Sequence, residues 1–191
     1  MSGRRRLCVF CGSSMPPEPA YREAATRLGQ EIGHAGIDLV YGGGRIGLMG
    51  LVADAALAAG AGVVGVIPTA LNGREIGHPG LTELVVVPDM QERKRQMFAL
   101  SDAVAVLPGG LGTLDEAFEA ITLRQLGFFD KSIVLVDIAG YWQPLHALVT
   151  RVIAAGFAAP DADRLFTVVT RAEDVIPACF SVNAGTKTMI G

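Results

Sequence analysis

The chain has 191 residues, half of them apolar and 24 of them glycine, with a formal net charge of −3. This length suits one domain with a sizeable core, and the slightly acidic balance gives no general attraction for nucleic acid. An odd number of cysteines argues against a disulfide framework and no signal-peptide pattern opens the chain, so we expect a cytoplasmic protein. The longest apolar region, residues 46–71, is interrupted by Asp54, glycines and Pro68, and we expect no membrane span.

Short apolar runs alternate with helical patterns along the whole chain. The runs that predict strands are residues 7–10, 37–41, 63–67, 84–87, 103–107, 133–136 and 166–169. Helices are expected at residues 18–34, 48–59, 141–155 and 171–180, and also after Asp89 and Thr113. The alternation indicates an α/β fold, a doubly wound, Rossmann-like parallel sheet with helices on both faces and ligands at the carboxyl ends of its strands. We expect a single nucleotide-binding domain over residues 1–180 and a loose tail at 181–191.

The first expected strand runs into Gly12, Ser13 and Ser14. Small hydroxyl residues at this point are well placed to contact a ligand, which makes Ser13 a candidate binding residue. Cys8 and Cys11 form a C-x-x-C match, but it falls in a strand pattern instead of at a helix start, and no second pair completes a metal site. We therefore do not favour redox or zinc chemistry there.

A glycine cluster follows the second expected strand. Its Gly42, Gly44 and Gly47 match G-x-G-x-x-G, the pattern of dinucleotide-binding loops. That pattern belongs after the first strand and requires an acidic residue about 20 positions later, whereas residues 63–67 contain neither Asp nor Glu. We interpret Gly43 and Gly44 as part of a turn where the backbone approaches a ligand or an anion, and not as an NAD site.

Two polar stretches come before the central motif. Residues 69–80 have no periodicity and are polar for longer than a simple turn needs, so they form a candidate ligand loop. In the next helix, Arg93 and its two basic neighbours are most simply a solvated face, with Met90 and Met97 supplying the buried stripe.

The strongest motif is Pro108-Gly109-Gly110-Leu111-Gly112-Thr113, which joins a buried strand to a helical pattern with apolar residues at Leu114, Phe118, Ile121 and Leu126. The first N–H groups of a helix have no partner within the helix, and their dipoles favour an anion in front of them. Gly109, Gly110 and Gly112 allow the backbone to approach a phosphate closely, and Thr113 adds a hydroxyl.

Glu116 is unusual in this motif because a phosphate repels a nearby carboxylate. Thr113-x-x-Glu116 matches a capping box, in which Glu116 would bond back to the start of the helix. The residue therefore either caps the helix or takes part in chemistry, and spacing alone leaves both readings open.

Met90-x-x-Arg93-Lys94 and Pro108-Gly109-Gly110-x-Gly112-Thr113-x-x-Glu116 together resemble the motifs of the Lonely Guy (LOG) family. Its members are cytokinin-activating phosphoribohydrolases, and older annotation often labels them lysine decarboxylases. The likeness covers about the first four-fifths of the chain. It includes Cys11-Gly12-Ser13-Ser14, the triple glycine, Arg74-Glu75-Ile76 and residues 121–127.

The resemblance implies hydrolysis of the N-glycosidic bond of an adenosine-type 5′-monophosphate, either a cytokinin nucleotide or AMP, to free base and ribose 5-phosphate. It implies a catalytic pair of Arg93 and Glu116. The residues that it places around the substrate are Gly110, Gly112 and Thr113 at the phosphate, with Glu75, Lys94 and Thr122 lining the rest of the site. Neither a metal nor a cofactor is implied, and relatives associate as homodimers or larger assemblies with the active site near the subunit interface.

Two alternatives remain open. One is an AMP nucleosidase for which cytokinin is irrelevant, because nothing in the sequence fixes the substituent on the base. The other is a non-catalytic nucleotide or cofactor carrier on a related fold. Glu116 favours an enzyme, because a carboxylate can stabilise the oxocarbenium-like charge of a breaking N-glycosidic bond, whereas a carrier has no use for an anion beside its phosphate.

Overall fold

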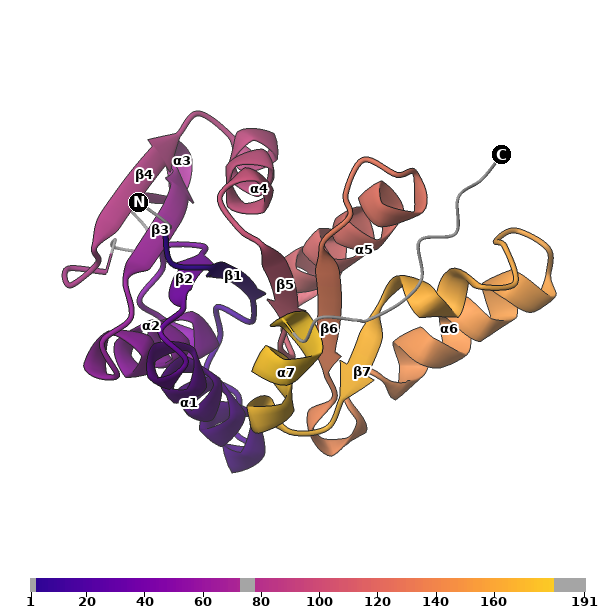
Figure 1. Ribbon diagram of the computed structural model, residues 1–191, viewed down its shortest axis with the longest axis horizontal. Helices are drawn as coiled ribbons and strands as arrows, with labels where there is room; N and C mark the ends of the chain where they lie inside the picture. The colour runs from indigo at the N-terminus through magenta and orange to yellow at the C-terminus, as the bar shows by residue number, and fades with distance from the viewer. Residues whose placement is uncertain (1–2, 73–77, 181–191) are drawn as a thin grey trace.

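The computed structural model describes residues 3–72 and 78–180, in which strands and helices alternate (Figure 1). The strands of these ranges are β1 (Arg6–Phe10), β2 (Asp38–Tyr41), β3 (Val63–Pro68), β4 (Glu83–Val87), β5 (Ala103–Val106), β6 (Ser132–Val136) and β7 (Thr167–Val169). The α-helices are α1 (Pro19–His34), α2 (Gly47–Ala58), α3 (Thr69–Asn72), α4 (Met90–Ala99), α5 (Leu111–Gln125), α6 (Gln143–Ala154) and α7 (Val175–Phe180). Short 3-10 turns are η1 (Ile138–Gly140), η2 (Ala162–Leu165) and η3 (Ala172–Asp174).

The strands form one parallel sheet in the order β4-β3-β2-β1-β5-β6-β7. This confirms the predicted α/β fold. The chain winds outward in one direction from β1 to β4 and in the other from β5 to β7, so the order reverses between β1 and β5. In such open sheets, ligands bind where the two neighbouring loops diverge at this switch point.

Alternate side chains of the central strands enter two separate apolar layers. Leu7 and Val9 face the layer formed with α1, α2 and α7, whereas Cys8 and Phe10 face the layer formed with α4, α5 and α6. Figure 1 shows α1, α2 and α7 together on one side of the sheet and α4 and α5 on the other. Burial on both faces explains why β1 and β5 read as continuous apolar runs.

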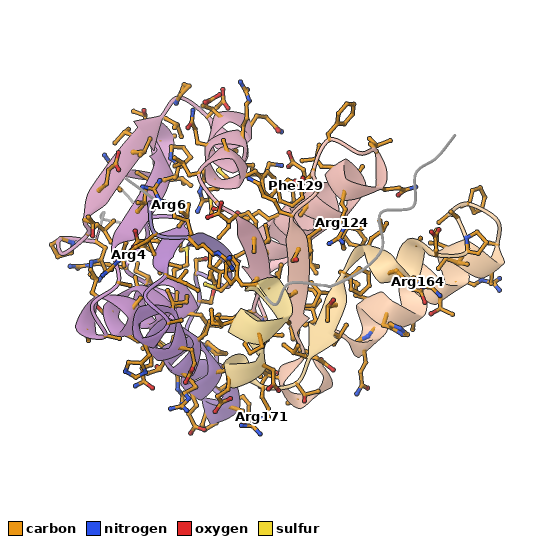
Figure 2. All side chains as sticks on the ribbon, in the orientation of Figure 1. Arg4, Arg6, Arg124, Phe129, Arg164 and Arg171 are labelled. Atoms are coloured by element: carbon orange, nitrogen blue, oxygen red, sulfur yellow. The ribbon has the colours of Figure 1, made fainter. Side chains whose placement is uncertain are left out.

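Arginine side chains lie on several parts of the molecule. Figure 2 shows Arg4, Arg164 and Arg171 on separate parts of the structure, so these arginines do not form one basic face. Among the helices of the described ranges, none has both the length and the apolar character needed to cross a bilayer. All three cysteines are buried free thiols, including Cys8 and Cys11 of the C-x-x-C match.

The structure corrects some sequence-based expectations, and others fall outside the described residues. The 69–80 segment begins with the short helix α3, and its candidate residue Glu75 lies outside the described ranges, as does the predicted tail. The predicted apolar stripe of α5 is wrong in part, because Phe118 and, just after the helix, Leu126 are exposed, whereas Ile121 is buried as expected. The helix buries small Ala117 and Ala120 instead, which lets it lie close to the sheet. In α4, Met97 is buried as expected, but Met90 is partly exposed.

Candidate active site

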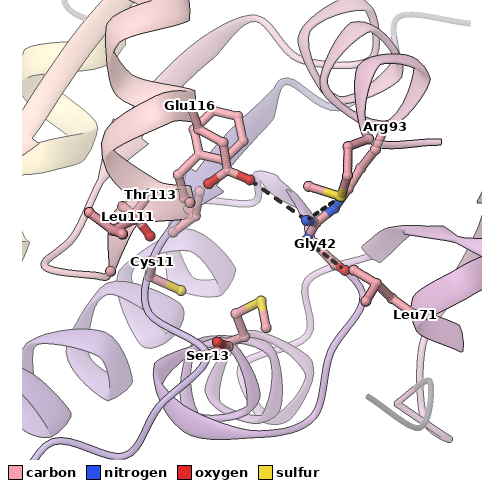
Figure 3. A pocket seen from close by; sticks show the side chains of 14 residues that line it. Cys11, Ser13, Gly42, Leu71, Arg93, Leu111, Thr113 and Glu116 are labelled. Atoms are coloured by element: carbon pink, nitrogen blue, oxygen red, sulfur yellow. Dashed lines mark hydrogen bonds and ion pairs between the residues drawn. The ribbon is translucent and has the colours of Figure 1, made fainter. Parts of the chain in front are cut away.

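A cavity of about 280 Å³ opens at the switch point of the sheet (Figure 3). Its walls come from β1 and the loop after it, the turn after β2, α2, α3, α4 and the start of α5. The residues that line it are Val9, Phe10, Cys11, Ser13, Gly42, Met49, Leu71, Met90, Arg93, Gly110, Leu111, Gly112, Thr113 and Glu116. Two motifs that are far apart in the sequence, around Arg93 and around Glu116, therefore meet in one hollow.

The first turn of α5 supplies an anion-binding end to this cavity. Gly110 is the N-cap residue and has no capping side chain, and the first backbone bond of the helix runs from Leu114 N to Gly110 O over 3.1 Å. The N–H groups of Leu111, Gly112 and Thr113 therefore have no acceptor within the helix. We call these three groups the α5 anion site, because the helix dipole and the free donors both favour a negative ligand there.

This helix start also decides between the two readings of Glu116. The helix begins at Leu111, so Thr113 is its third residue and Glu116 lies in its second turn. A capping box needs the Thr at the N-cap position, which Gly110 occupies here. The capping interpretation is therefore wrong, and Glu116 points into the cavity instead (Figure 3).

The loops after β1 and β5 touch each other beside the anion site. Gly12 N donates to Pro108 O over 3.1 Å, and a Cβ on Gly12 would lie 3.2 Å from the Cα of Gly109. A Cβ on Gly109 would overlap the buried side chain of Thr113. Glycines at these positions let the two loops close together, which brings Ser13 to the wall of the same cavity.

Arg93 is buried and held by backbone carbonyls at the ends of two strands. Its Nε donates to Val66 O and its Nη2 donates to Gly42 O, both over 3.1 Å. Its Nη1 lies 3.8 Å from Glu116 Oε1, so the remaining edge of the guanidinium faces the carboxylate (Figure 3). The solvated-face interpretation is wrong for Arg93 and holds for Arg95, whose side chain is 72% exposed.

Glu116 is a buried carboxyl group in a weakly compensated environment. Burial raises its pKa from 4.5 to about 7, and the nearby Arg93 guanidinium only partly offsets this effect. Asp115 raises the pKa further, while Lys94 lowers it. A group with a pKa near neutrality can both accept and return a proton under ordinary conditions, which is the property expected of a general acid–base residue.

The other predicted site residues fall into two groups. Ser13, Gly110, Gly112 and Thr113 line the cavity, whereas Gly109 lines an adjoining cavity of about 270 Å³. Among the described residues, the other predicted ones that do not line this cavity of about 280 Å³ are Gly43, Gly44, Lys94 and Thr122. Gly43 is buried against Ile67 and Leu84, and Thr122 is exposed on α5.

Sequence reasoning missed several cavity residues. Met49 and Leu71 had no signal of their own, and Cys11 was noted only in the C-x-x-C match and in the Cys11-Gly12-Ser13-Ser14 stretch. Tyr141, which lines the adjoining cavity, was also missed; it lies just after η1, and its hydroxyl donates to Gly109 O and so supports the glycine loop. Burial raises the pKa of the Cys11 thiol well above its ordinary value, and the Glu116 carboxylate acts in the same direction.

Fold and site together define a Rossmann-like α/β protein whose switch-point cavity is lined by the N-terminus of a helix and by a buried Arg–Glu pair. Residues 49–179 match the protein family described as "Possible lysine decarboxylase". A probable cytokinin riboside 5′-monophosphate phosphoribohydrolase of Oryza sativa subsp. japonica is 45% identical over 90% of this chain and 77% of its own length. An Arabidopsis thaliana enzyme described as a cytokinin riboside 5′-monophosphate phosphoribohydrolase is 43% identical, over 90% of this chain and 81% of its own. The chain belongs to this family, the LOG family.

Solved structures with the same architecture are more distant in sequence. The molybdenum cofactor carrier protein of Chlamydomonas reinhardtii superimposes with a TM-score of 0.70 at 20% identity, covering 92% of this chain and 95% of that one. The molybdenum cofactor binding protein of Rippkaea orientalis gives a TM-score of 0.67, also at 20% identity, covering 92% of this chain and 95% of that one. At this level of identity the likeness concerns the fold alone.

Proposed function

We propose that the protein hydrolyses the N-glycosidic bond of a cytokinin riboside 5′-monophosphate or of AMP, releasing the free base and ribose 5-phosphate. The observation that carries this proposal is the buried pair of Arg93 and Glu116 beside the α5 anion site. The relatives at 45% and 43% identity are named as phosphoribohydrolases of cytokinin riboside 5′-monophosphate, which supports the first of these substrates. The catalytic pair is thus Arg93 and Glu116, and the 5′-phosphate is bound by Gly110, Gly112, Thr113 and Ser13, with Gly109 shaping the loop.

The order of groups in the cavity suits a nucleotide. The phosphate accepts hydrogen bonds from the first turn of α5, and Glu116 lies about one helical turn further along the same helix. Such a spacing corresponds to the step from a 5′-phosphate to its own ribose ring. Met90 and Leu71 supply apolar wall beyond Arg93, where the base would lie.

The reaction can be written with these residues alone. As the bond from C1′ to the base nitrogen breaks, its electron pair leaves with the base and positive charge builds on the ribose. The ionised Glu116 stabilises this charge and accepts a proton from the attacking water, whose oxygen bonds to C1′. The proton then passes to the departing base. Arg93 favours the ionised form of Glu116 and orients it, because its other two donors are fixed on Val66 O and Gly42 O.

We also propose that the protein forms a homodimer or a larger homo-oligomer through α5. Exposed apolar side chains gather along this helix and just after it, namely Leu111, Phe118, Leu126 and Phe128. Leu111 also lines the cavity, so a second copy on this surface would lie at the mouth of the active site. Thr122 lies between Phe118 and Leu126 on the same exposed face of the helix, where it would approach the partner's site instead of its own.

The free cysteines support a reducing, cytoplasmic location for the protein.

One assay tests the proposal against both alternatives. Base release is measured by chromatography with AMP, N6-isopentenyl-AMP, adenosine and no substrate. Faster release from the isopentenyl nucleotide supports a cytokinin enzyme, and equal or faster release from AMP supports an AMP nucleosidase. Nucleotide binding by calorimetry without any base release would identify a carrier and overturn the proposed reaction.

A further inference from the structure

Lys94 is next to Arg93 on α4, yet it is directed to a different part of the molecule. Its Nζ lies 2.9 Å from Asp115 Oδ2 and also contacts Glu119 Oε2, and its side chain is only 5% exposed. Asp115 and Glu119 stand immediately before and three residues after Glu116 on α5. Consecutive residues of α4 therefore contact α5 on both sides of the catalytic carboxylate.

We infer that Lys94 is a positioning residue for the reaction, because its ammonium joins α4 to α5 through Asp115 and Glu119 and so fixes the approach of Arg93 to Glu116. This inference rests on the proposed function of that pair. It differs from a substrate contact, which would require Lys94 to reach the cavity.

The packing of the two helices shows why such a link matters. Over the described residues, the backbones of α4 and α5 make little direct contact with each other. Both helices pack on the sheet through the same apolar layer, and the ion pairs that join them near the site are Arg93 with Glu116 and Lys94 with Asp115 and Glu119. A separation of 3.8 Å between Arg93 and Glu116 is sensitive to any shift between the helices, and misplacement by about 1 Å can cost roughly 100-fold in rate.

The same contacts balance the charge around Glu116. The groups that face it are Arg93 and Lys94 from α4, Asp115 and Glu119 from its own helix, the thiol of Cys8 from β1 and that of Cys11 just after β1. Burial has the largest effect on the pKa of Glu116; Arg93 and Lys94 lower the pKa, whereas Asp115 and Glu119 raise it. Loss of Lys94 would leave two unneutralised carboxylates beside a third, and the pKa of Glu116 would rise.

The test compares Lys94→Met with Arg95→Met, which removes an exposed cation from the next position of the same helix. Base release from AMP is measured as kcat and KM between pH 5.5 and 9. We expect Lys94→Met to lower kcat by about 10- to 100-fold with KM within about threefold. The midpoint of its rise in kcat/KM with pH should move up by roughly 0.5 to 1 pH unit. Arg95→Met should match the wild type. In Lys94→Arg the midpoint should lie close to the wild-type value, because the positive charge is kept.

A triple variant without charge at positions 94, 115 and 119 separates the effect of helix position from the effect of charge. It also tests the inference if Lys94→Met does not fold. In Lys94→Met/Asp115→Asn/Glu119→Gln no charge is left unpaired, so the midpoint should return close to the wild-type value while kcat stays low. The phosphate of AMP titrates identically in every assay, so differences in midpoint belong to the protein.

Two results would overturn the inference. One is a wild-type kcat in the triple variant. The other is a KM raised more than about tenfold in Lys94→Met with an unchanged midpoint, which would make Lys94 a substrate contact. A wild-type enzyme that releases no base is a different failure, because it removes the proposed function and this inference with it.

Discussion

The turns after β2 and after β5 are both rich in glycine and lie at the same edge of the sheet, yet they need glycine for opposite reasons. A Cβ on Gly110 or Gly112 would meet no atom within 4 Å, so this turn keeps space open in front of free N–H groups. A Cβ on Gly42 would overlap the Arg93 guanidinium, to which the Gly42 carbonyl is bonded. The β5 turn thus offers donors to a ligand, whereas the β2 turn offers space and an acceptor to the protein's own cation.

Glu116 lies between the two turns, and its removal should have the largest effect. Glu116→Gln retains the shape of the side chain but cannot become an anion, so we expect kcat to fall by at least about 100-fold. The measurement is base release at saturating AMP. Activity close to wild type would show that the carboxylate is not catalytic and would require a different mechanism.

The same variant should gain stability at high pH. The unfolded carboxyl loses its proton near pH 4.5, whereas the folded one keeps it until about pH 7. The wild-type protein therefore loses free energy of unfolding as the pH rises through this window, by up to about 3 kcal/mol. Glu116→Gln does not titrate, so its melting temperature should exceed that of the wild type at pH 8 by more than it does at pH 5. Equal differences at the two pH values would contradict a raised pKa.

Gly42→Ala tests whether the β2 turn serves Arg93. The added methyl group takes the place of the guanidinium, so Arg93 must leave its two carbonyl partners and its position beside Glu116. We expect kcat to fall by about 100-fold while the affinity for AMP changes little, because the α5 anion site is untouched. Kinetics and calorimetry with AMP separate these two quantities. A variant that loses affinity but keeps kcat would place a ligand at this turn.

Arg93→Lys makes the same point through the cation. Lysine keeps the charge but lacks the planar fork that bonds Val66 O and Gly42 O together while facing Glu116. We expect a fall in kcat of about 10- to 100-fold. Arg95→Lys is the matched control, and its exposed side chain should make it nearly silent. Equal activity of Arg93→Lys and Arg95→Lys would show that Arg93 has no role in the reaction.

Gly112→Ala should have the smallest effect and a different character. Its Cβ has free space, so the fold is kept and the first helical turn gains up to about 1 kcal/mol from the higher helix propensity of alanine. The methyl group enters the space of the phosphate, so KM for AMP should rise about tenfold while the slow hydrolysis of adenosine stays unchanged. If Gly112→Ala had wild-type kinetics with AMP, the phosphate would not bind at this site. Comparable kcat/KM values for adenosine and AMP in the wild type would lead to the same conclusion.

The sequence alone predicted the structure correctly where the local residue pattern decides it. The apolar runs predicted the strands, because strands that are buried on both faces are apolar along their whole length. The alternation of these runs with helical patterns predicted the parallel sheet. The sequence was insufficient where partners come from distant segments. Arg93 and Lys94 look like surface residues because their partners, such as Val66 O and Glu119, belong to other elements. The N-cap of α5 was misplaced by three residues, at Thr113 instead of Gly110, because a glycine N-cap has no side-chain signal, and this error created the false capping box.

Cys11 has a practical consequence for chemical probes of this cavity. A thiol in a ligand pocket is usually an attractive target for covalent inhibitors and for alkylating labels. Here burial and the neighbouring Glu116 raise the pKa of Cys11, so the reactive thiolate is scarce at physiological pH. Reagents such as iodoacetamide would leave the pocket unlabelled, and the thiol would resist oxidation by peroxide. Inhibitors of this protein are better built around a phosphate mimic for the first turn of α5 than around a cysteine-directed warhead.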